Sequence, residues 1–184
     1  MSSKALPVIG ISCGDLNGIG MEIIMKTLSD PGIMEICTPV VFASSKSASY
    51  HRKALKFEEF SFDLIKRLEA IKVGKPNLMT IWDEEVPLEL GKLSNAVGNY
   101  ALKSLDAACG ALERNEIDAL VTAPIHKQNI QSDKFRFAGH TDYLEARFKG
   151  KAPMLLVSDQ MRMALATVHI PLNEVSSKIT EELI

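Results

Sequence analysis

The chain has 184 residues, of which 46% are hydrophobic and 24% charged, and its formal net charge is −2. This length allows one domain with a substantial core or two small lobes. The near-neutral charge gives no electrostatic footprint for nucleic acid, and no apolar run reaches membrane-spanning length. The N-terminus also has no signal-peptide pattern, so we expect a cytoplasmic protein. The three cysteines, Cys13, Cys37 and Cys109, are far apart and odd in number, which favours free thiols over disulfides or a metal pair.

The first predicted element is a buried strand, the apolar run Leu6–Ser12. A glycine-rich turn from Cys13 to Gly20 follows it, and Met21–Leu28 has helical spacing. A strand, glycine turn and helix can present backbone N–H groups to an anion, and Asp15 would lie in that turn. The spacing matches neither nucleotide-binding glycine pattern. The alternative is that glycine only permits close packing or a positive φ angle.

The run Pro39–Ser44 predicts a second buried strand, followed by a polar helix from Ser45 to about Lys56. His51 lies in that helix beside two cations, and we assign it to a solvated face. Between Phe57 and Glu89, short apolar pieces alternate with turn residues, which indicates a small antiparallel excursion.

The clearest predicted helix runs from Asn95 to Arg114, with Ser94 or Asn95 as its N-cap. Ile117–Val121 is then the next strand. Apolar strands that alternate with helices indicate an α/β fold with a largely parallel sheet flanked by helices. We expect Leu6–Ser12 and Ile117–Val121 to be central strands of that sheet.

A polar stretch follows the strand that ends at Val121, and its side chains suit a phosphorylated, hydroxylated small molecule. Cations would meet the phosphate charge, and hydroxyls and imidazoles would fix the orientation. The alternative is a long polar surface loop. The residues concerned are Thr122, His126, Lys127, Arg136, Gly139, His140 and Thr141.

The last part of the chain predicts four short elements. They are a helix at Thr141–Phe148, a hairpin or two adjacent strands at Met154–Ser158 and Met161–Thr167, and a helix at Asn173–Ile179. His169 follows the second strand, where α/β enzymes place site residues, although a hydrogen-bonded histidine at a strand end is an equal alternative. Thr180–Glu182 resembles the start of a further helix, so we expect a piece of a longer protein.

Three short motifs occur along the chain in a familiar order. They are G-D-x-x-G-I-G-x-E at Gly14–Glu22, T-A-P-I-x-K at Thr122–Lys127 with G-H-T at Gly139–Thr141, and T-x-H-x-P-L at Thr167–Leu172. Together they resemble the 4-hydroxythreonine-4-phosphate dehydrogenase family, and residues 1–184 would correspond to the N-terminal portion of such an enzyme. Leu16 and Met21 stand where the family usually has proline, and Asp142 where glutamate is common.

This resemblance implies a truncated fold like that of isocitrate and isopropylmalate dehydrogenases. It implies NAD-dependent oxidation and decarboxylation of 4-phosphohydroxy-L-threonine in pyridoxal 5′-phosphate (vitamin B6) biosynthesis, by a homodimer with shared active sites. It also implies a divalent metal (zinc, magnesium or cobalt) held by three histidines. By resemblance, His140 and Thr141 bind substrate and His169 is the first metal ligand. Lys127, His126 and Asp15 are possible pocket residues, and the NAD contacts are unassigned.

Two alternatives stay open. A sister dehydrogenase acting on threonate or erythronate 4-phosphate would use the same loops. A phosphate-binding fragment without chemistry is the other, because the remaining metal ligands and most NAD contacts would lie beyond Ile184. For the same reason we expect this chain to be inactive alone.

Overall fold

The computed structural model describes residues 6–181 and 183, which belong to two units, Met1–Arg136 and Phe137–Ile184. Glu182, part of the helix start expected at Thr180–Glu182, lies outside the described residues. Within the described ranges, none of the helices is long and apolar enough to span a membrane.

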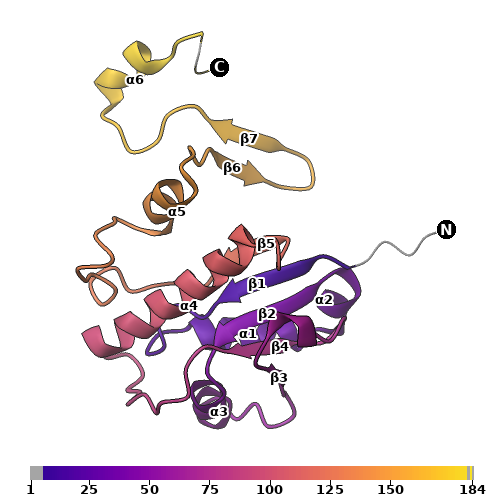
Figure 1. Ribbon diagram of the computed structural model, residues 1–184. Helices are drawn as coiled ribbons and strands as arrows, with labels where there is room; N and C mark the ends of the chain where they lie inside the picture. Colours follow the sequence, from indigo (N-terminus) through magenta and orange to yellow (C-terminus); the bar gives the residue numbers. More distant parts are fainter. Residues whose placement is uncertain (1–5, 182, 184) are drawn as a thin grey trace, which may run out of the picture. The chain divides into compact units, whose positions relative to one another are not determined.

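The first unit alternates strands and helices, as Figure 1 shows. Its strands are β1 (Val8–Ser12), β2 (Thr38–Ala43), β3 (Asp63–Ile65), β4 (Asn77–Thr80) and β5 (Ala119–Thr122). Its helices are α1 (Gly20–Leu28), α2 (Pro31–Ile36), α3 (Ser45–Ala54), the short 3₁₀ helix Leu68–Ala70 and α4 (Asn95–Glu113). Predicted helices at Met21–Leu28, Ser45–Lys56 and Asn95–Arg114 are confirmed.

The sheet of the first unit has the order β3-β4-β2-β1-β5, and every pair in it is parallel. The α/β prediction is therefore confirmed, and β1 lies inside the sheet between β2 and β5. The antiparallel excursion predicted for Phe57–Glu89 is wrong: its two strands extend the parallel sheet. They are only three and four residues long, so turn residues dominate the local pattern and conceal their direction.

The expectation that Ile117–Val121 forms a central strand is wrong for the described residues, because β5 is an edge of the sheet. Val121 is 51% exposed. Beside it lies an apolar pocket of about 150 Å³, lined by side chains of α1, β1 and the β5 end. An apolar run predicts a strand, but it does not show whether the strand has a neighbouring strand on each of its two edges.

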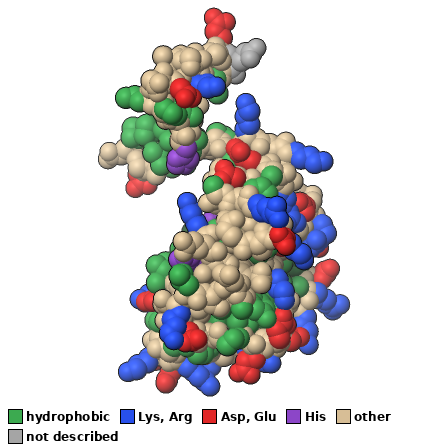
Figure 2. Space-filling model, turned by 90° about the vertical axis from the view of Figure 1, so that its left-hand side faces the viewer, with side chains coloured by type: hydrophobic (Ala, Val, Ile, Leu, Met, Phe, Trp, Pro, Cys, Tyr) green, Lys and Arg blue, Asp and Glu red, His purple; other side chains and the backbone are tan. Residues whose placement is uncertain are grey.

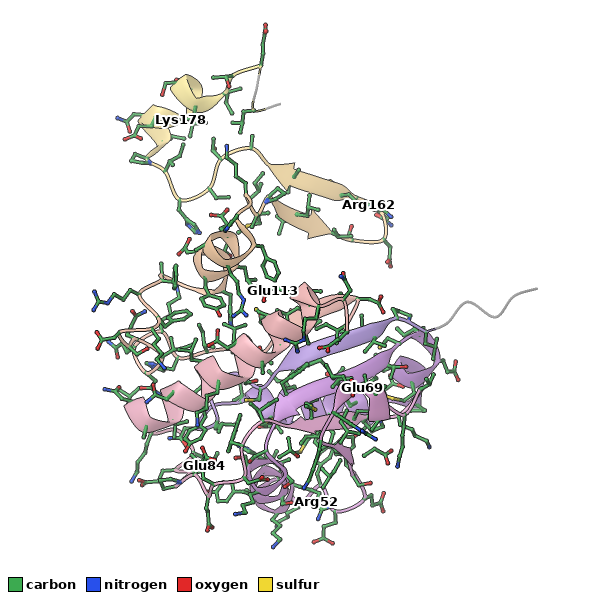
Figure 3. The ribbon with its side chains drawn as sticks, viewed as in Figure 1. Arg52, Glu69, Glu84, Glu113, Arg162 and Lys178 are labelled. Atoms are coloured by element: carbon green, nitrogen blue, oxygen red, sulfur yellow. The ribbon has the colours of Figure 1, made fainter. Side chains whose placement is uncertain are left out.

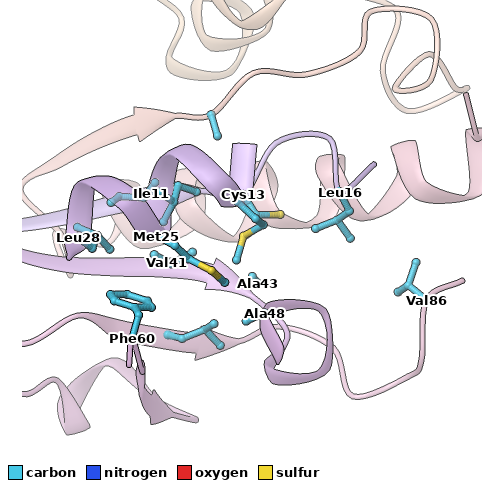
Figure 4. Close-up of a cluster of buried hydrophobic side chains, with 14 of the residues drawn as sticks. Ile11, Cys13, Leu16, Met25, Leu28, Val41, Ala43, Ala48, Phe60 and Val86 are labelled. Carbon is cyan, nitrogen blue, oxygen red and sulfur yellow. The ribbon is translucent and has the colours of Figure 1, made fainter. Parts of the chain in front are cut away.

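Alternate residues of the strands face two different hydrophobic clusters. Ile11, Val41 and Leu78 pack with α1 and α3 on one face, and Figure 4 shows part of this cluster. Val40 and Phe42 pack with Ala108 and Ala111 of α4 on the other face. Burying both faces is what a parallel sheet requires, and it explains why β2 reads as a continuous apolar run.

Helix α4 is also tied to the strand ends by a buried hydroxyl. Ser104 Oγ accepts a hydrogen bond from the Cys13 N–H at 2.9 Å and donates to the Phe42 carbonyl at 2.5 Å. At the start of the helix, Ser94 Oγ accepts from the Val97 N–H at 3.4 Å, as the cap prediction requires. The two Ser104 bonds fix the carboxyl ends of β1 and β2 against α4.

His51 is not on a solvated face; its side chain is 1% exposed, which corrects that assignment. Burial lowers the pKa of His51, and a hydrogen bond to the backbone of Leu16 opposes this effect. The inner face of α3 consists of Ser47, Ala48 and His51. This helix buries small and polar residues, so its sequence gives no apolar stripe to identify the face.

The second unit contains α5 (His140–Phe148), β6 (Met154–Val157), β7 (Arg162–Leu165) and α6 (Leu172–Lys178). Strands β6 and β7 pair antiparallel, so the predicted hairpin is confirmed. Arg162, labelled in Figure 3, begins β7. All four residues of β6 are exposed, and Figure 2 shows green hydrophobic side chains on the surface of this unit.

Candidate functional site

The turn after β1 is held by a backbone hydrogen bond to the segment after β5. The Asp15 N–H donates to the Pro124 carbonyl at 2.9 Å. Gly14 has a φ of 66°, and a Cβ there would come within 2.3 Å of the same carbonyl oxygen. Glycine therefore permits both the positive φ and the close approach, as one of the two sequence interpretations proposed.

The two strands that carry these segments are register partners. Ser12 pairs with Thr122, the last residue of each strand. The strand order changes direction at β1, since β2, β4 and β3 lie on one side of it and β5 on the other. In open parallel sheets, ligands bind outside the carboxyl ends of the strands at such a point. Asp15 is thus placed beside the loop that carries His126 and Lys127.

The Asp15 side chain is 8% exposed and already has one local partner. Its Oδ1 accepts a hydrogen bond from the Asn17 N–H at 3.1 Å. A carboxylate has several further acceptor positions. Asp15 can therefore hold the turn and still accept a hydrogen bond from a hydroxyl or amine of a ligand.

The loop after β5 contains buried polar atoms that no described residue satisfies. They are His126 Nδ1, Asn129 Nδ2 and Ser132 Oγ. Each unpaired buried polar group costs about 1–3 kcal/mol. Lys127 is exposed in the same loop. A polar ligand that reached these atoms would find donors and acceptors already desolvated, with a cation beside them.

His140 and Thr141 begin α5 in the second unit, after the N-cap Gly139. The His140 side chain is partly buried, and its Nε2 has no hydrogen-bond partner among the described residues. Burial lowers the pKa of His140, which keeps the imidazole neutral near pH 7. A neutral imidazole offers one donor and one acceptor to a hydroxyl. The prediction that Lys127 lies near His140 joins residues of the two units and stays a prediction.

His169 is exposed and has a φ of 56°. Within the described residues, no group of three His, Cys, Asp or Glu side chains is placed to hold a metal ion. One imidazole supplies one bond, whereas catalytic metal sites of this kind use three protein ligands. The described residues therefore do not form a metal site, and the role of His169 as a ligand stays a prediction.

The sequence interpretation missed Asn17 and Asn129, which are 3% and 4% exposed. Both hold the backbone of the segment between β4 and α4. No local pattern identified either residue, because the backbone groups that their side chains bond lie 35 to 75 residues away along the chain.

The sheet and its flanking helices define an α/β protein, and its candidate site is formed by polar loops at the carboxyl ends of the strands. The family described as "Pyridoxal phosphate biosynthetic protein PdxA" matches residues 35–184. The chain belongs to this family, as the resemblance of its motifs predicted.

Known relatives carry a consistent name. A 4-hydroxythreonine-4-phosphate dehydrogenase of Bacteroides thetaiotaomicron is 42% identical over 178 residues, 96% of this chain and 49% of the relative. One from Campylobacter jejuni is 32% identical over 187 residues, 94% of this chain and 51% of the relative. The chain thus spans about half the length of the curated relatives it matches.

Solved structures agree on the fold. The crystal structure of a 4-hydroxythreonine-4-phosphate dehydrogenase from Burkholderia phymatum superposes with a TM-score of 0.83 at 25% identity. The superposition covers 98% of this chain and 55% of the Burkholderia phymatum chain. The Klebsiella pneumoniae enzyme of the same name, at 21% identity and a TM-score of 0.78, supports the fold alone, over 98% of this chain and 56% of that one.

Proposed function

We propose that this chain forms part of an NAD-dependent dehydrogenase that oxidises and decarboxylates 4-phosphohydroxy-L-threonine in pyridoxal 5′-phosphate (vitamin B6) biosynthesis. The observation that carries the proposal is the 42% identity, over 96% of the chain, to a relative of that name. Because the chain covers about half of that relative, the activity is proposed for the whole protein. The same proposal includes a cytoplasmic homodimer with shared active sites. Analytical ultracentrifugation of the whole protein would test whether it is a dimer.

The residues of this chain suit the recognition of such a substrate. Lys127, exposed in the loop after β5, offers a cation to a phosphate. Asp15 offers a carboxylate to the amine or a hydroxyl. His140, neutral because of its burial, can donate to or accept from the hydroxyl that is oxidised. These contacts would orient the carbon that carries the transferred hydrogen.

In the proposed reaction, the secondary alcohol gives up a hydride and releases its hydroxyl proton to solvent. The resulting β-keto acid then loses carbon dioxide, and the carbon that carried the carboxylate takes up a proton from solvent. NAD, when bound, would supply the acceptor for this hydride. No step is assigned to a metal, because the described residues hold no three-ligand group. The contribution of this chain is to bind and orient the substrate.

An assay of the natural full-length protein tests the proposal. We expect NAD reduction with 4-phosphohydroxy-L-threonine to exceed that with threonate or erythronate 4-phosphate. Faster turnover of either four-carbon acid would assign the protein to a sister dehydrogenase. Absence of NAD reduction with all three substrates would refute the dehydrogenase proposal.

A single substitution tests the site. His140→Ala should lower kcat/KM at least about tenfold, because leaving the buried substrate hydroxyl without its partner costs roughly 1–3 kcal/mol. Gln160→Ala, an exposed position on the β6–β7 turn of the same unit, is the control and should leave kcat/KM unchanged. Unchanged kinetics in a folded His140→Ala protein would remove His140 from the site.

A further inference from the structure

The segment Leu88–Ser94, called the strap here, is the last part of the connection between β4 and α4 and is held from three different elements. Tyr50 of α3 donates its hydroxyl to the Leu88 carbonyl at 3.3 Å. Asn17, in the turn after β1, bonds the middle of the strap. Asn129, in the loop after β5, accepts a hydrogen bond from the Ser94 N–H at 3.2 Å. The strap therefore bridges the two loops that meet at the switch point.

Asn17 makes the largest set of these contacts. Its Oδ1 accepts from the Glu89 N–H at 3.0 Å, and its Nδ2 donates to the Lys92 carbonyl at 2.9 Å. Its own carbonyl accepts from the Gly91 N–H at 2.8 Å. The Asn17 N–H meanwhile donates to Asp15 Oδ1. One buried residue thus connects the strap to the carboxylate that we place in the substrate site.

Asn129 is the second anchor and lies three residues after His126. Its side chain is 4% exposed, and its Nδ2 has no partner among the described residues. Its backbone lies against α4, since a Cβ on Gly98 would come within 1.8 Å of the Asn129 carbonyl oxygen. The loop that carries His126 and Lys127 is therefore fixed to both the strap and the start of α4.

The strap has few other means of staying in place. Leu88, at its start, is partly buried against the core, but Leu90 and Leu93 are exposed, and Gly91 adopts a φ of 80° with open space around it. The residues before it are fixed, because Val86 is buried and Glu84, labelled in Figure 3, pairs with Lys103 of α4 at 2.8 Å. A segment with few buried apolar contacts opens at low cost, so its amide anchors decide its position.

We propose that Asn17 and Asn129 are positioning residues, which hold the strap against the loops after β1 and β5 and thereby set the positions of Asp15, His126 and Lys127. This inference rests on the proposed function, since it assigns the three residues to the substrate site. A substrate that binds when both loops are in place must in turn stabilise the closed strap, because coupling between binding and closure is reciprocal.

Hydrogen exchange of the full-length protein tests the anchoring. Asn17→Ala removes the acceptor of the Glu89 amide but leaves the carbonyl that accepts from Gly91. Faster exchange at Glu89 alone would report one lost bond. We expect the Gly91 amide to exchange at least about fivefold faster as well, because the whole strap is released. Asn99→Ala, which removes an exposed amide from α4, is the control and should change neither rate. Gly91 protection that survives Asn17→Ala would overturn the proposal.

Kinetics then separate positioning from a structural role. In Asn17→Ala, saturating 4-phosphohydroxy-L-threonine should restore slow exchange at Gly91, and kcat/KM should fall at least about fivefold. A released strap that does not respond to substrate, with kcat/KM unchanged, would reduce Asn17 to a structural residue and overturn the proposal. An inactive wild-type protein would refute the proposed function instead, while the exchange rates would still decide whether Asn17 holds the strap.

Discussion

The two units contain similar apolar runs, but the run in the first unit is buried and the run in the second unit is exposed. In the first unit, all six residues of β2 are buried between helices on both faces of the sheet. In the second, β6 is equally apolar in sequence, yet all four of its residues are exposed. A two-stranded hairpin presents two faces, and the short helices of its unit leave them open to solvent. An apolar run thus predicts a strand, whereas burial depends on the elements that cover it.

The two units also differ in how their loops are held in place. The first unit fixes its loops with buried groups such as Ser104, Asn17 and Asn129. In the second unit Tyr143 is buried, and the centroid of its ring lies 5.4 Å from that of Phe137. His169 of the same unit is exposed. The loops of the first unit are therefore positioned in advance by its own core, and those of the second unit have less to hold them.

The largest expected difference between the units is in the cost of truncating an apolar side chain. Phe42→Ala should lower the free energy of unfolding by about 3–5 kcal/mol, because the ring is fully buried against α4. Leu155→Ala in β6 should change it by about 0.5 kcal/mol or less. Urea denaturation measures both. A cost above about 2 kcal/mol for Leu155→Ala would mean that the hairpin face is covered in the folded protein, and the comparison would fail.

Glycine substitutions should show the next largest difference. Gly98→Ala places a Cβ 1.8 Å from the Asn129 carbonyl oxygen, so backbone must move. We expect a loss of about 2 kcal/mol or more in the free energy of unfolding, within the range for overpacking a core. Gly139→Ala in the second unit meets no atom within 4 Å and should cost less than about 1 kcal/mol. Equal Tm values for the two variants would contradict the packing described for the strap.

The stability of the first unit should depend on pH through His51. Burial lowers its pKa, so the unfolded chain takes up a proton below about pH 6.5 that the folded chain does not. Stability should therefore fall as pH drops through that value and level off below the folded pKa. His51→Gln should weaken this dependence, whereas His169→Gln, at an exposed position, should retain it. Thermal unfolding at a series of pH values gives the comparison, and parallel curves for wild type and His51→Gln would contradict it.

The smallest effect concerns thiol reactivity in the first unit. Burial raises the pKa of Cys13 to about 12, and the side chain has no exposed surface. Burial also raises the pKa of Cys37, but that side chain is partly exposed. A thiol reagent at neutral pH should modify Cys37 slowly, and Cys13 only after unfolding. Peptide mapping of the modified sites would detect the difference, and early labelling of Cys13 would show that the β1 turn opens.

Local patterns located the elements of both units, because periodicity and capping act over a few residues. The helix capped by Ser94, the buried run at Val40 and Val41, and the hairpin at β6 and β7 were all predictable in this way. The motifs at Gly14–Glu22 and Thr122–Lys127 also identified the family. The parallel pairing of β3 and β4 escaped prediction, because the turn residues around these two short strands outnumber their apolar positions.

Sequence alone determined the fold class, the family and the loops that carry the candidate site, since each depends on residue types at short spacing. Tertiary structure decided that β5 is an edge, that His51 is buried and that Asn17 holds a strap 72 residues further along the chain. These features depend on which distant segments meet. A residue's own neighbours in sequence fix its secondary structure, but burial and hydrogen-bond partners come from packing between elements.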